Sequence, residues 1–237
     1  MIKKLPSIVL VHGAWADGSS WANVINLLSA EGYGVVAAPL PLTSLVDDVA
    51  ALSRAIERTT GPVILVGHAY AGAVIGEIRN PRIRAYVYVS ALAPDEGESV
   101  AEVFYRTTPD PRAPKLAPDS QGLIYLPPEA FPTAFAQNAS AEQNALLFAV
   151  QRPISSACIS VPVGRPGWKD KPSWFLVAED DRMIVRETQE FMARRMHAHV
   201  ESRAVDHAPL ITAPLLVANI IRAAAGTALT AYESDAI

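Results

Sequence analysis

One stretch of this chain, from Gly61 to Gly72, constrains the fold more than any other. It reads G-P-V-I-L-V-G-H-A-Y-A-G. The apolar run from Pro62 to Val66 is typical of a buried strand, and the residues from Ala71 to Arg79 are suited to a helix. Small residues between the two segments allow a sharp turn. The stretch therefore predicts a buried strand that turns directly into a helix.

The same alternation of short apolar strands and helical segments continues along most of the chain. It predicts βαβ units and a mostly parallel sheet flanked by helices. Further strands are predicted at Ser7 to Val11, Tyr33 to Ala38, Ile83 to Ser90, Ser173 to Ala178 and His199 to Val205. Further helices are predicted at Ser19 to Ala30, Ser44 to Thr59, Arg186 to His197 and Pro214 to Ala225. The tail, Thr227 to Ile237, is expected to be disordered.

A proline-rich insertion interrupts the alternation between Ala93 and Lys171. An unstructured connection of this length is uncommon in a compact domain. We therefore predict one domain over residues 1–237, with a core at 1–92 and 172–226 and a helical cap at 93–171. A surface excursion without a role at the site is the alternative. Short helices are expected within the cap at Ser99 to Arg106, Pro128 to Gln137 and Ser140 to Gln151.

Composition argues against several classes of function. The chain has 237 residues, of which 50% are hydrophobic, and this is enough to bury a large core in one domain. A net charge of -4 without a basic cluster argues against a nucleic-acid partner. The single cysteine, Cys158, has no partner for an internal disulfide and no metal-ligand spacing around it. The apolar run Ile8 to Val11 is too short for a signal peptide or a membrane span. We expect a cytoplasmic protein without a membrane partner or a metal.

The turn from Gly67 to Ala71 has the spacing of a nucleophile elbow, G-x-S-x-G. In such an elbow a strained turn holds a nucleophilic side chain above the edge of a sheet. The middle position, where this chemistry requires a hydroxyl, is Ala69. A methyl group cannot attack a carbonyl. The sequence therefore has the turn that would hold a nucleophile, but it lacks the nucleophilic side chain.

Backbone donors for an oxyanion are predicted beside this turn. The sequence H-G-A-W, His12 to Trp15, follows the first predicted strand, at the sheet edge where open α/β sheets bind ligands. The N-H of Ala14 and the N-H of Tyr70, directly after the nucleophile position, are the expected donors. His12 and His68 lie beside the site and are expected to shape these turns.

A base and an acid are predicted on the turns that follow the last two strands. His207 is the candidate base, because it lies in a turn after the final strand with a helix behind it. Asp181, within A-E-D-D-R-M-I, is the candidate acid that orients the imidazole. Asp180 is the alternative, and either aspartate could instead cap the next helix. The resulting order is nucleophile, acid, base.

Taken together, these motifs resemble the α/β-hydrolases, in particular small bacterial esterases, and more distantly plant methylesterases and hydroxynitrile lyases. The matching residues are V-H-G-A-W at 11–15, G-H-A-Y-A-G at 67–72, D-R-M-I at 181–184 and D-H at 206–207. Relatives show G-H-S-x-G-G or G-H-S-Y-A-G at the second motif. The resemblance spans Ser7 to about Ala225. It implies an α/β-hydrolase fold, a Ser-His-Asp triad, no cofactor, and hydrolysis of esters through an acyl-enzyme.

Ala69 departs from this family pattern, and three interpretations stay open. An engineered Ser-to-Ala replacement would leave every other element of the site in place, as is seen here. A natural pseudoenzyme or ligand receptor would need no nucleophile. A lyase step that uses the His-Asp pair as general base would not need one either.

The substrate is expected to be a neutral small-molecule ester with an apolar or aromatic acyl part. Aromatic residues are frequent in the predicted cap and charges near them are few. The oligomeric state is not predicted. The residues expected to contact substrate are Trp15, His12, His68, Phe104, Tyr105 and Trp168.

Overall fold

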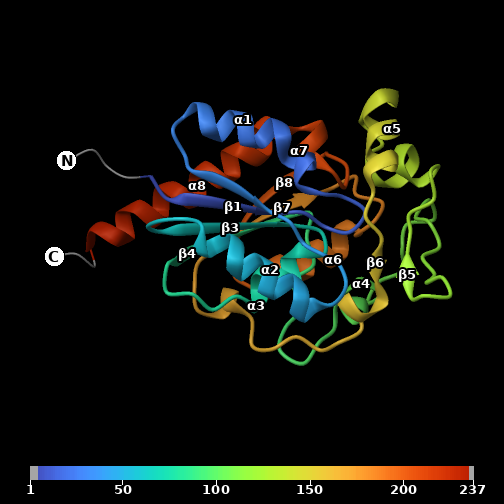
Figure 1. Ribbon diagram of the computed structural model, residues 1–237, viewed down its shortest axis with the longest axis horizontal. Helices are drawn as coiled ribbons and strands as arrows, with labels where there is room; N and C mark the ends of the chain where they lie inside the picture. Colours follow the sequence, from blue (N-terminus) through green and yellow to red (C-terminus); the bar gives the residue numbers. More distant parts are fainter. Residues whose placement is uncertain (1–4, 235–237) are drawn as a thin grey trace.

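A six-stranded parallel sheet forms the centre of the protein in a computed structural model that describes residues 5–234 (Figure 1). The strand order is β2-β1-β3-β4-β7-β8, and every neighbouring pair is parallel. The mostly parallel sheet predicted from the sequence is confirmed. The strands are β1 (Ser7–Val11), β2 (Val35–Ala38), β3 (Val63–His68), β4 (Ile83–Val89), β7 (Ser173–Ala178) and β8 (His199–Arg203).

Helices cover both faces of this sheet. Helices α1 and α8 pack against each other on one face, and α2 packs against α3 on the other (Figure 1). All residues of β3 and β7 are buried, which explains why these strands are continuous apolar runs rather than alternating ones. The core helices are α1 (Ala22–Ala30), α2 (Leu45–Glu57), α3 (Ala71–Glu77), α6 (Arg186–Arg195), α7 (Pro209–Thr212) and α8 (Pro214–Ser234), with a single helical turn at Gly18–Trp21.

The helix ends follow local capping chemistry in some places and depart from the expectation in one. Ser44 caps α2 as predicted, because its side chain accepts a hydrogen bond from the N-H of Asp47. Helix α8 continues to Ser234, so the expectation of disorder from Thr227 onward is wrong as far as Ser234. The alanine-rich sequence of this segment favours helix. Residues 235–237 lie outside the described part of the chain.

The insertion between β4 and β7 lies at the edge toward which the strands point, drawn from green to yellow-orange in Figure 1. The three predicted helices are present in shorter form, one of them as a π-helical turn. An antiparallel pair of two-residue strands was not expected, since strands of that length show no recognisable pattern. The elements are α4 (Val100–Phe104), β5 (Leu123–Ile124), the π-helical turn (Phe131–Phe135), α5 (Ala141–Val150), β6 (Ile154–Ser155), and single turns at Ser156–Cys158 and Gly167–Lys169.

The order of the strands reverses between β1 and β3, and this places two turns side by side. From β1 the chain crosses to β2 on one side and later returns to β3 on the other. Val11 pairs with Gly67 in the register of β1 and β3, so the turns after both strands start at the same level. Ligands bind at such switch points in open α/β sheets. Across residues 5–234, no helix has the length and apolar character needed to cross a membrane.

Candidate active site

The turn between β3 and α3 has the strained geometry of an elbow. Strand β3 ends at His68 and α3 begins at Ala71, so two residues make the turn. Ala69 has φ of 51°, in the left-handed region that residues other than glycine rarely adopt. A Cβ on Gly67 would lie 2.8 Å from the carbonyl oxygen of Ala71, so only glycine fits this close approach. Backbone strain of this kind concentrates at functional sites. The strained backbone of Ala69 therefore marks this turn as a candidate site.

His207 and Asp181 form a buried pair next to this turn. The Nδ1 atom of His207 lies 2.8 Å from Oδ2 of Asp181, and both side chains are almost completely buried. The other carboxylate oxygen of Asp181 accepts hydrogen bonds from the N-H groups of Met183 and Ile184, each at 2.8 Å. Gln189 donates to Oδ2 at 2.9 Å. These contacts hold the carboxylate in the orientation in which Oδ2 faces the imidazole of His207.

The neighbouring aspartates have different surroundings. Asp180 is exposed, and its carbonyl oxygen accepts a hydrogen bond from the Gln137 side chain at 2.7 Å. Asp206 is completely buried but accepts from the N-H of Asn138 at 2.9 Å and from the Thr212 hydroxyl at 2.6 Å. Of the three aspartates, the structure brings Asp181 to the imidazole of His207.

Two N-H groups, one in the turn after β1 and one in the elbow, have no acceptor within the described part of the chain. Among residues 5–234, the N-H groups of Ala14 and Tyr70 make no hydrogen bond. Ala14 and Tyr70 are 6% and 3% exposed, and buried N-H groups are nearly always paired. Both residues line the cavity above Ala69. Their position suits them to donate hydrogen bonds to a negatively charged oxygen of a ligand.

His12 shapes the backbone at the end of β1. Its Nε2 accepts a hydrogen bond from the N-H of Leu40 at 3.2 Å, so its Nδ1 carries the proton and donates to the carbonyl of Gly13 at 2.9 Å. Burial lowers the pKa of His12 and favours this neutral form. His12 does not line the cavity, so the structure does not place it in contact with a substrate.

His68 supports the backbone of His207 from behind. Its Nε2 lies 2.8 Å from the carbonyl oxygen of His207, and the two ring centroids are 4.8 Å apart. Burial, and then the charge of His207, hold the pKa of His68 well below its usual value. His68 is also absent from the cavity wall, although it was expected to contact substrate.

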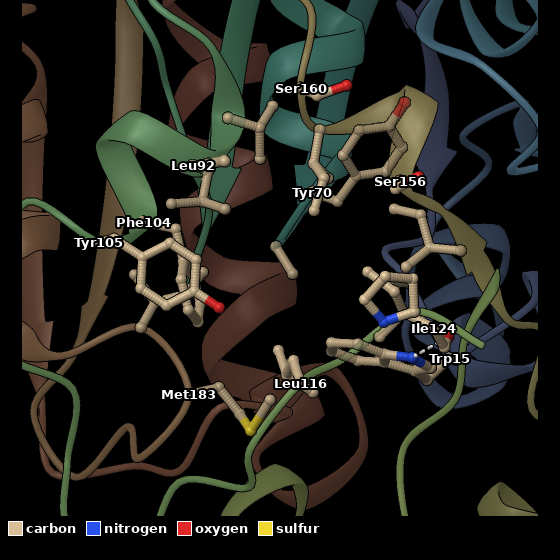
Figure 2. A pocket seen from close by; sticks show the side chains of 18 of the residues that line it. Trp15, Tyr70, Leu92, Phe104, Tyr105, Leu116, Ile124, Ser156, Ser160 and Met183 are labelled. Atoms are coloured by element: carbon tan, nitrogen blue, oxygen red, sulfur yellow. Dashed lines mark hydrogen bonds between the residues drawn. The ribbon is translucent and has the colours of Figure 1, made fainter. Parts of the chain in front are cut away.

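A cavity of about 260 Å³ includes Ala69 in its wall. Figure 2 shows other side chains that line this cavity, among them Trp15 and Tyr105. Its wall includes Trp15 and Tyr70 from the core, and Phe104 and Tyr105 from the insertion. Substrate contact by Trp15, Phe104 and Tyr105 stays a prediction. Within residues 5–234, no Asp, Glu, Lys or Arg side chain contributes to the wall. The full lining is Ala14, Trp15, Ala69, Tyr70, Leu92, Val100, Ala101, Phe104, Tyr105, Leu116, Pro118, Ile124, Ile154, Ser156, Ile159, Ser160, Met183, Ile184 and His207.

Trp168 was expected at the cavity but lies elsewhere. It belongs to the single helical turn Gly167–Lys169, which packs against α3, and it is not part of the cavity wall. Aromatic content indicates that a segment is buried, but not which neighbour buries it. The expected substrate contact of Trp168 is therefore not supported.

The match to a family model decides where this chain belongs. The model described as the alpha/beta hydrolase family matches residues 8–220. The chain is a member of the alpha/beta hydrolase family. One relative of this hydrolase is the alpha/beta hydrolase nvfD of Aspergillus novofumigatus, which is 26% identical over 94% of this chain and 98% of that protein. The carbendazim hydrolyzing esterase of Nocardioides is 30% identical over 44% of this chain and 50% of that protein.

Solved structures share the fold of this hydrolase at lower identity. Polyneuridine aldehyde esterase superposes with a TM-score of 0.79 at 20% identity, covering 92% of this chain and 99% of that chain. The pyrethroid hydrolase from Sphingobium faniae gives 0.77 at 20% identity, covering 94% and 98%. Tomato methylketone synthase I, in a variant complexed with beta-ketoheptanoate, gives 0.80 at 18% identity, covering 95% and 99%. Identities this low show a common fold.

The insertion of this hydrolase also supports the turns at the carboxyl edge of the sheet, which the sequence does not predict. The Trp15 indole donates to the carbonyl of Ile124 at 2.9 Å (Figure 2), and the N-H of Trp15 donates to the carbonyl of Arg152 at 3.0 Å. The Phe135 ring lies 5.2 Å from the ring of His207. Arg182, next to Asp181, donates to the carbonyl of Thr133 at 2.7 Å. These pairs are far apart in sequence, so no local pattern identifies them.

Proposed function

We propose that this chain carries the site of a serine hydrolase for neutral carboxylic esters, in which alanine occupies the nucleophile position. Ala69 stands at that position, His207 is the general base and Asp181 orients it. The N-H groups of Ala14 and Tyr70 are the oxyanion donors. The observation that carries the proposal is the hydrogen-bonded His207–Asp181 pair, next to a strained elbow and to two N-H groups that have no acceptor among residues 5–234.

With a serine hydroxyl at position 69, these groups form a complete mechanism. Oγ attacks the ester carbonyl while Nε2 of His207 takes the hydroxyl proton. The carbonyl oxygen becomes an oxyanion held by the two N-H groups, and Asp181 stabilises the imidazolium. Collapse expels the alcohol, which receives the proton from His207. A water molecule activated by His207 then releases the acid from the acyl-enzyme.

The chain with Ala69 should bind esters without hydrolysing them. Every group except the nucleophile is present, as expected when a serine is replaced by alanine without other change. An engineered replacement and a natural loss of serine predict the same behaviour, so the chemistry of the site does not depend on which occurred. The methyl group leaves the cavity and the oxyanion donors in place for binding.

The cavity favours a neutral substrate with an apolar or aromatic acyl part. Among the residues that the structure describes, no Asp, Glu, Lys or Arg lines the wall, and most of the lining residues are aliphatic or aromatic. A charged acyl group would lose its hydration there without gaining a partner. Two similar proteins are named as esterases, the carbendazim hydrolyzing esterase and polyneuridine aldehyde esterase, and this also supports an ester substrate.

The test is to install the missing hydroxyl and measure turnover of p-nitrophenyl butyrate. Ala69→Ser should raise kcat at least about 10³-fold over the unchanged chain, because the nucleophile, base and acid act as one unit. Ala101→Ser is the matched control, since it adds a hydroxyl to the cavity wall away from the elbow. Equal turnover by Ala69→Ser and the unchanged chain would overturn the proposal.

A second candidate needs no nucleophile and is favoured by a specific observation. Nε2 of His207 has no protein partner among the described residues, and a structural neighbour, tomato methylketone synthase I, has been solved with beta-ketoheptanoate. For a β-keto acid, the oxyanion donors would hold the keto oxygen while the bond to the carboxylate breaks. The electron pair would form an enolate, CO₂ would leave, and a proton would reach the carbon from His207 or water. The apolar wall would favour loss of the charged carboxylate.

Measuring CO₂ release separates the two candidates. If the unchanged chain decarboxylates a β-keto acid above the uncatalysed rate, and His207→Ala abolishes this, the second candidate holds. If the unchanged chain releases no CO₂ and Ala69→Ser hydrolyses the ester, the serine-hydrolase proposal holds.

A further inference from the structure

A buried carboxylate lies behind the elbow, outside the cavity. Asp48, in the first turns of α2, is completely buried and forms no ion pair with any residue between 5 and 234. Its Oδ2 accepts a hydrogen bond from the Tyr70 hydroxyl at 2.7 Å. Its Oδ1 accepts from the N-H of Leu42 at 2.7 Å, and the Cys158 thiol lies 3.7 Å from Oδ2. A buried carboxylate without a cation is costly unless such donors hold it.

The three donors come from three separate parts of the molecule. Tyr70 belongs to the elbow, Leu42 to the loop between β2 and α2, and Cys158 to the insertion. The Cys158 turn follows β6, and its neighbours Ser156 and Ile159 line the cavity. Asp48 therefore joins the reaction centre to the wall that surrounds the substrate.

Tyr70 carries this contact to the reaction centre. Its N-H is one of the two proposed oxyanion donors, while its hydroxyl is bound to Asp48. The elbow has only two residues between β3 and α3. A turn this short cannot absorb a movement of the Tyr70 side chain without moving the Tyr70 backbone. The hydrogen bond from the Tyr70 hydroxyl to Asp48 therefore also fixes the direction of the Tyr70 N-H.

Leu42 shows that the same carboxylate also holds a strained loop. Leu42 is a buried residue with φ of 60°, in the left-handed region. Its N-H is bound to Asp48, and its carbonyl oxygen accepts from the N-H of Ser155 at 2.9 Å. Strain in a bulky residue persists where surrounding contacts hold it. Asp48 thus supports β6 through Leu42 as well as through Cys158.

We propose that Asp48 is a positioning residue that, through the Tyr70 hydroxyl, aims the Tyr70 N-H at the substrate carbonyl and fixes the insertion over it. The inference rests on the proposed function, because it assigns Tyr70 as an oxyanion donor. Burial raises the pKa of Tyr70 and raises the pKa of Cys158 to about 12, so both remain protonated donors near neutral pH.

The test uses the unchanged chain, which holds an ester without turning it over under the proposed function. Phenyl butyrate labelled with ¹³C at its carbonyl is added, and the infrared band of the bound carbonyl is recorded by isotope difference. Two well-aimed N-H donors should move this band below its position in an apolar solvent. Tyr70→Phe and Asp48→Asn, which preserve shape, should each lose a substantial part of that shift.

A matched variant separates positioning from general damage to the fold. Tyr86→Phe also removes a buried tyrosine hydroxyl, one that donates to the carbonyl of Ile78 at 2.9 Å, and Tyr86 does not line the cavity. It should leave the carbonyl band unchanged. In the Ala69→Ser background, Tyr70→Phe should lower kcat about 10- to 100-fold with little change in KM, and Tyr86→Phe should not.

Each outcome bears on a different claim. If the ester binds with a shifted band that Tyr70→Phe and Asp48→Asn leave unchanged, Asp48 is merely structural and the inference is overturned. If Asp48→Asn fails to fold, the Tyr70→Phe band alone decides, because that variant keeps the carboxylate. If no ester binds to the unchanged chain, the proposed function fails and the positioning role falls with it.

Discussion

The carboxyl edge of the sheet and the inserted cap, residues 93–171, contribute to the same cavity by different means. At the edge, turns of a few residues leave strands in fixed register, so Ala14, Ala69 and His207 are placed by the sheet itself. In the cap, lining residues such as Leu116 lie on irregular segments rich in proline. Under the proposed function, the sheet edge would hold the reacting groups and the insertion would select the substrate.

The two regions are nevertheless joined by hydrogen bonds. The Trp15 indole donates to the carbonyl of Ile124 in the cap, and the N-H of Asn138 in the cap donates to Asp206, next to His207. A change at the edge should therefore alter kcat, and a change in the cap wall should alter KM. We call these connecting hydrogen bonds joints, and a change at a joint should alter the free energy of unfolding.

The largest effect is expected at the base. In the Ala69→Ser background, His207→Ala should lower kcat for p-nitrophenyl butyrate about 10⁴-fold or more, because the hydroxyl then has no proton acceptor. His199→Ala is the control, since His199 is exposed on β8. Comparable loss in both variants, measured at saturating substrate, would contradict the assignment of His207.

A smaller effect is expected at a joint. Asp206→Ala removes the acceptor of the Asn138 N-H, and it leaves the Thr212 hydroxyl with only its longer contact of 3.2 Å to the carbonyl of Ala208. Urea unfolding should show a loss of about 2–3 kcal/mol in the free energy of unfolding. Asp180→Ala, at an exposed side chain, should change it by less than about 0.5 kcal/mol. Equal effects would mean that the joint does not hold the cap.

The cap wall should affect binding more than chemistry. Phe104→Ala in the Ala69→Ser background removes an aromatic side chain from the cavity wall, so KM for p-nitrophenyl butyrate should rise about tenfold with a smaller change in kcat. Tyr125→Ala removes a cap aromatic that is 52% exposed and outside the cavity, and should leave KM unchanged. If Phe104→Ala lowered kcat by a larger factor than it raised KM, this would contradict the expectation that the cap wall affects binding and the sheet edge affects chemistry.

The smallest effect is the pH dependence of stability from the buried histidines. Burial lowers the pKa of His12 and His68 below the 6.5 of the unfolded chain. As pH falls through 6.5, the unfolded state binds protons that the folded state does not, so the free energy of unfolding decreases. Between pH 7 and 6 each histidine should contribute less than about 1 kcal/mol. His68→Gln should flatten this slope in urea titrations, and His199→Gln should not.

The sequence was sufficient for the elements that depend on local pattern. The run Val63–His68 has the composition of a buried parallel strand, and the small residues after it allow one sharp turn, so the elbow was predictable. The position of His207 after the last strand makes it a candidate base, and the structure places its ring beside Asp181. The sequence leaves the choice between Asp180 and Asp181 open, because the donors that hold Asp181 lie in a bend before α6 and on α6 itself, and the sequence does not reveal their geometry.

The rest depends on contacts between distant segments. Asp48 has the pattern of an acid in the first turn of a helix, and nothing local shows that it faces Tyr70, 22 residues away. Trp168 and Phe104 are both aromatic residues of the cap, yet Phe104 alone of the two lines the cavity. Which side of an irregular segment faces the site is decided by tertiary packing, which composition does not encode.

The central claim, that a site for ester hydrolysis lacks its nucleophile alone, is tested most directly by covalent labelling. The unchanged chain, Ala69→Ser and Ala69→Ser/His207→Ala are each treated with an alkyl fluorophosphonate, and intact masses and labelled peptides are measured. The account predicts one adduct, at position 69, in Ala69→Ser and none in the other two. An unlabelled Ala69→Ser protein, or an adduct at another residue in all three, would contradict it.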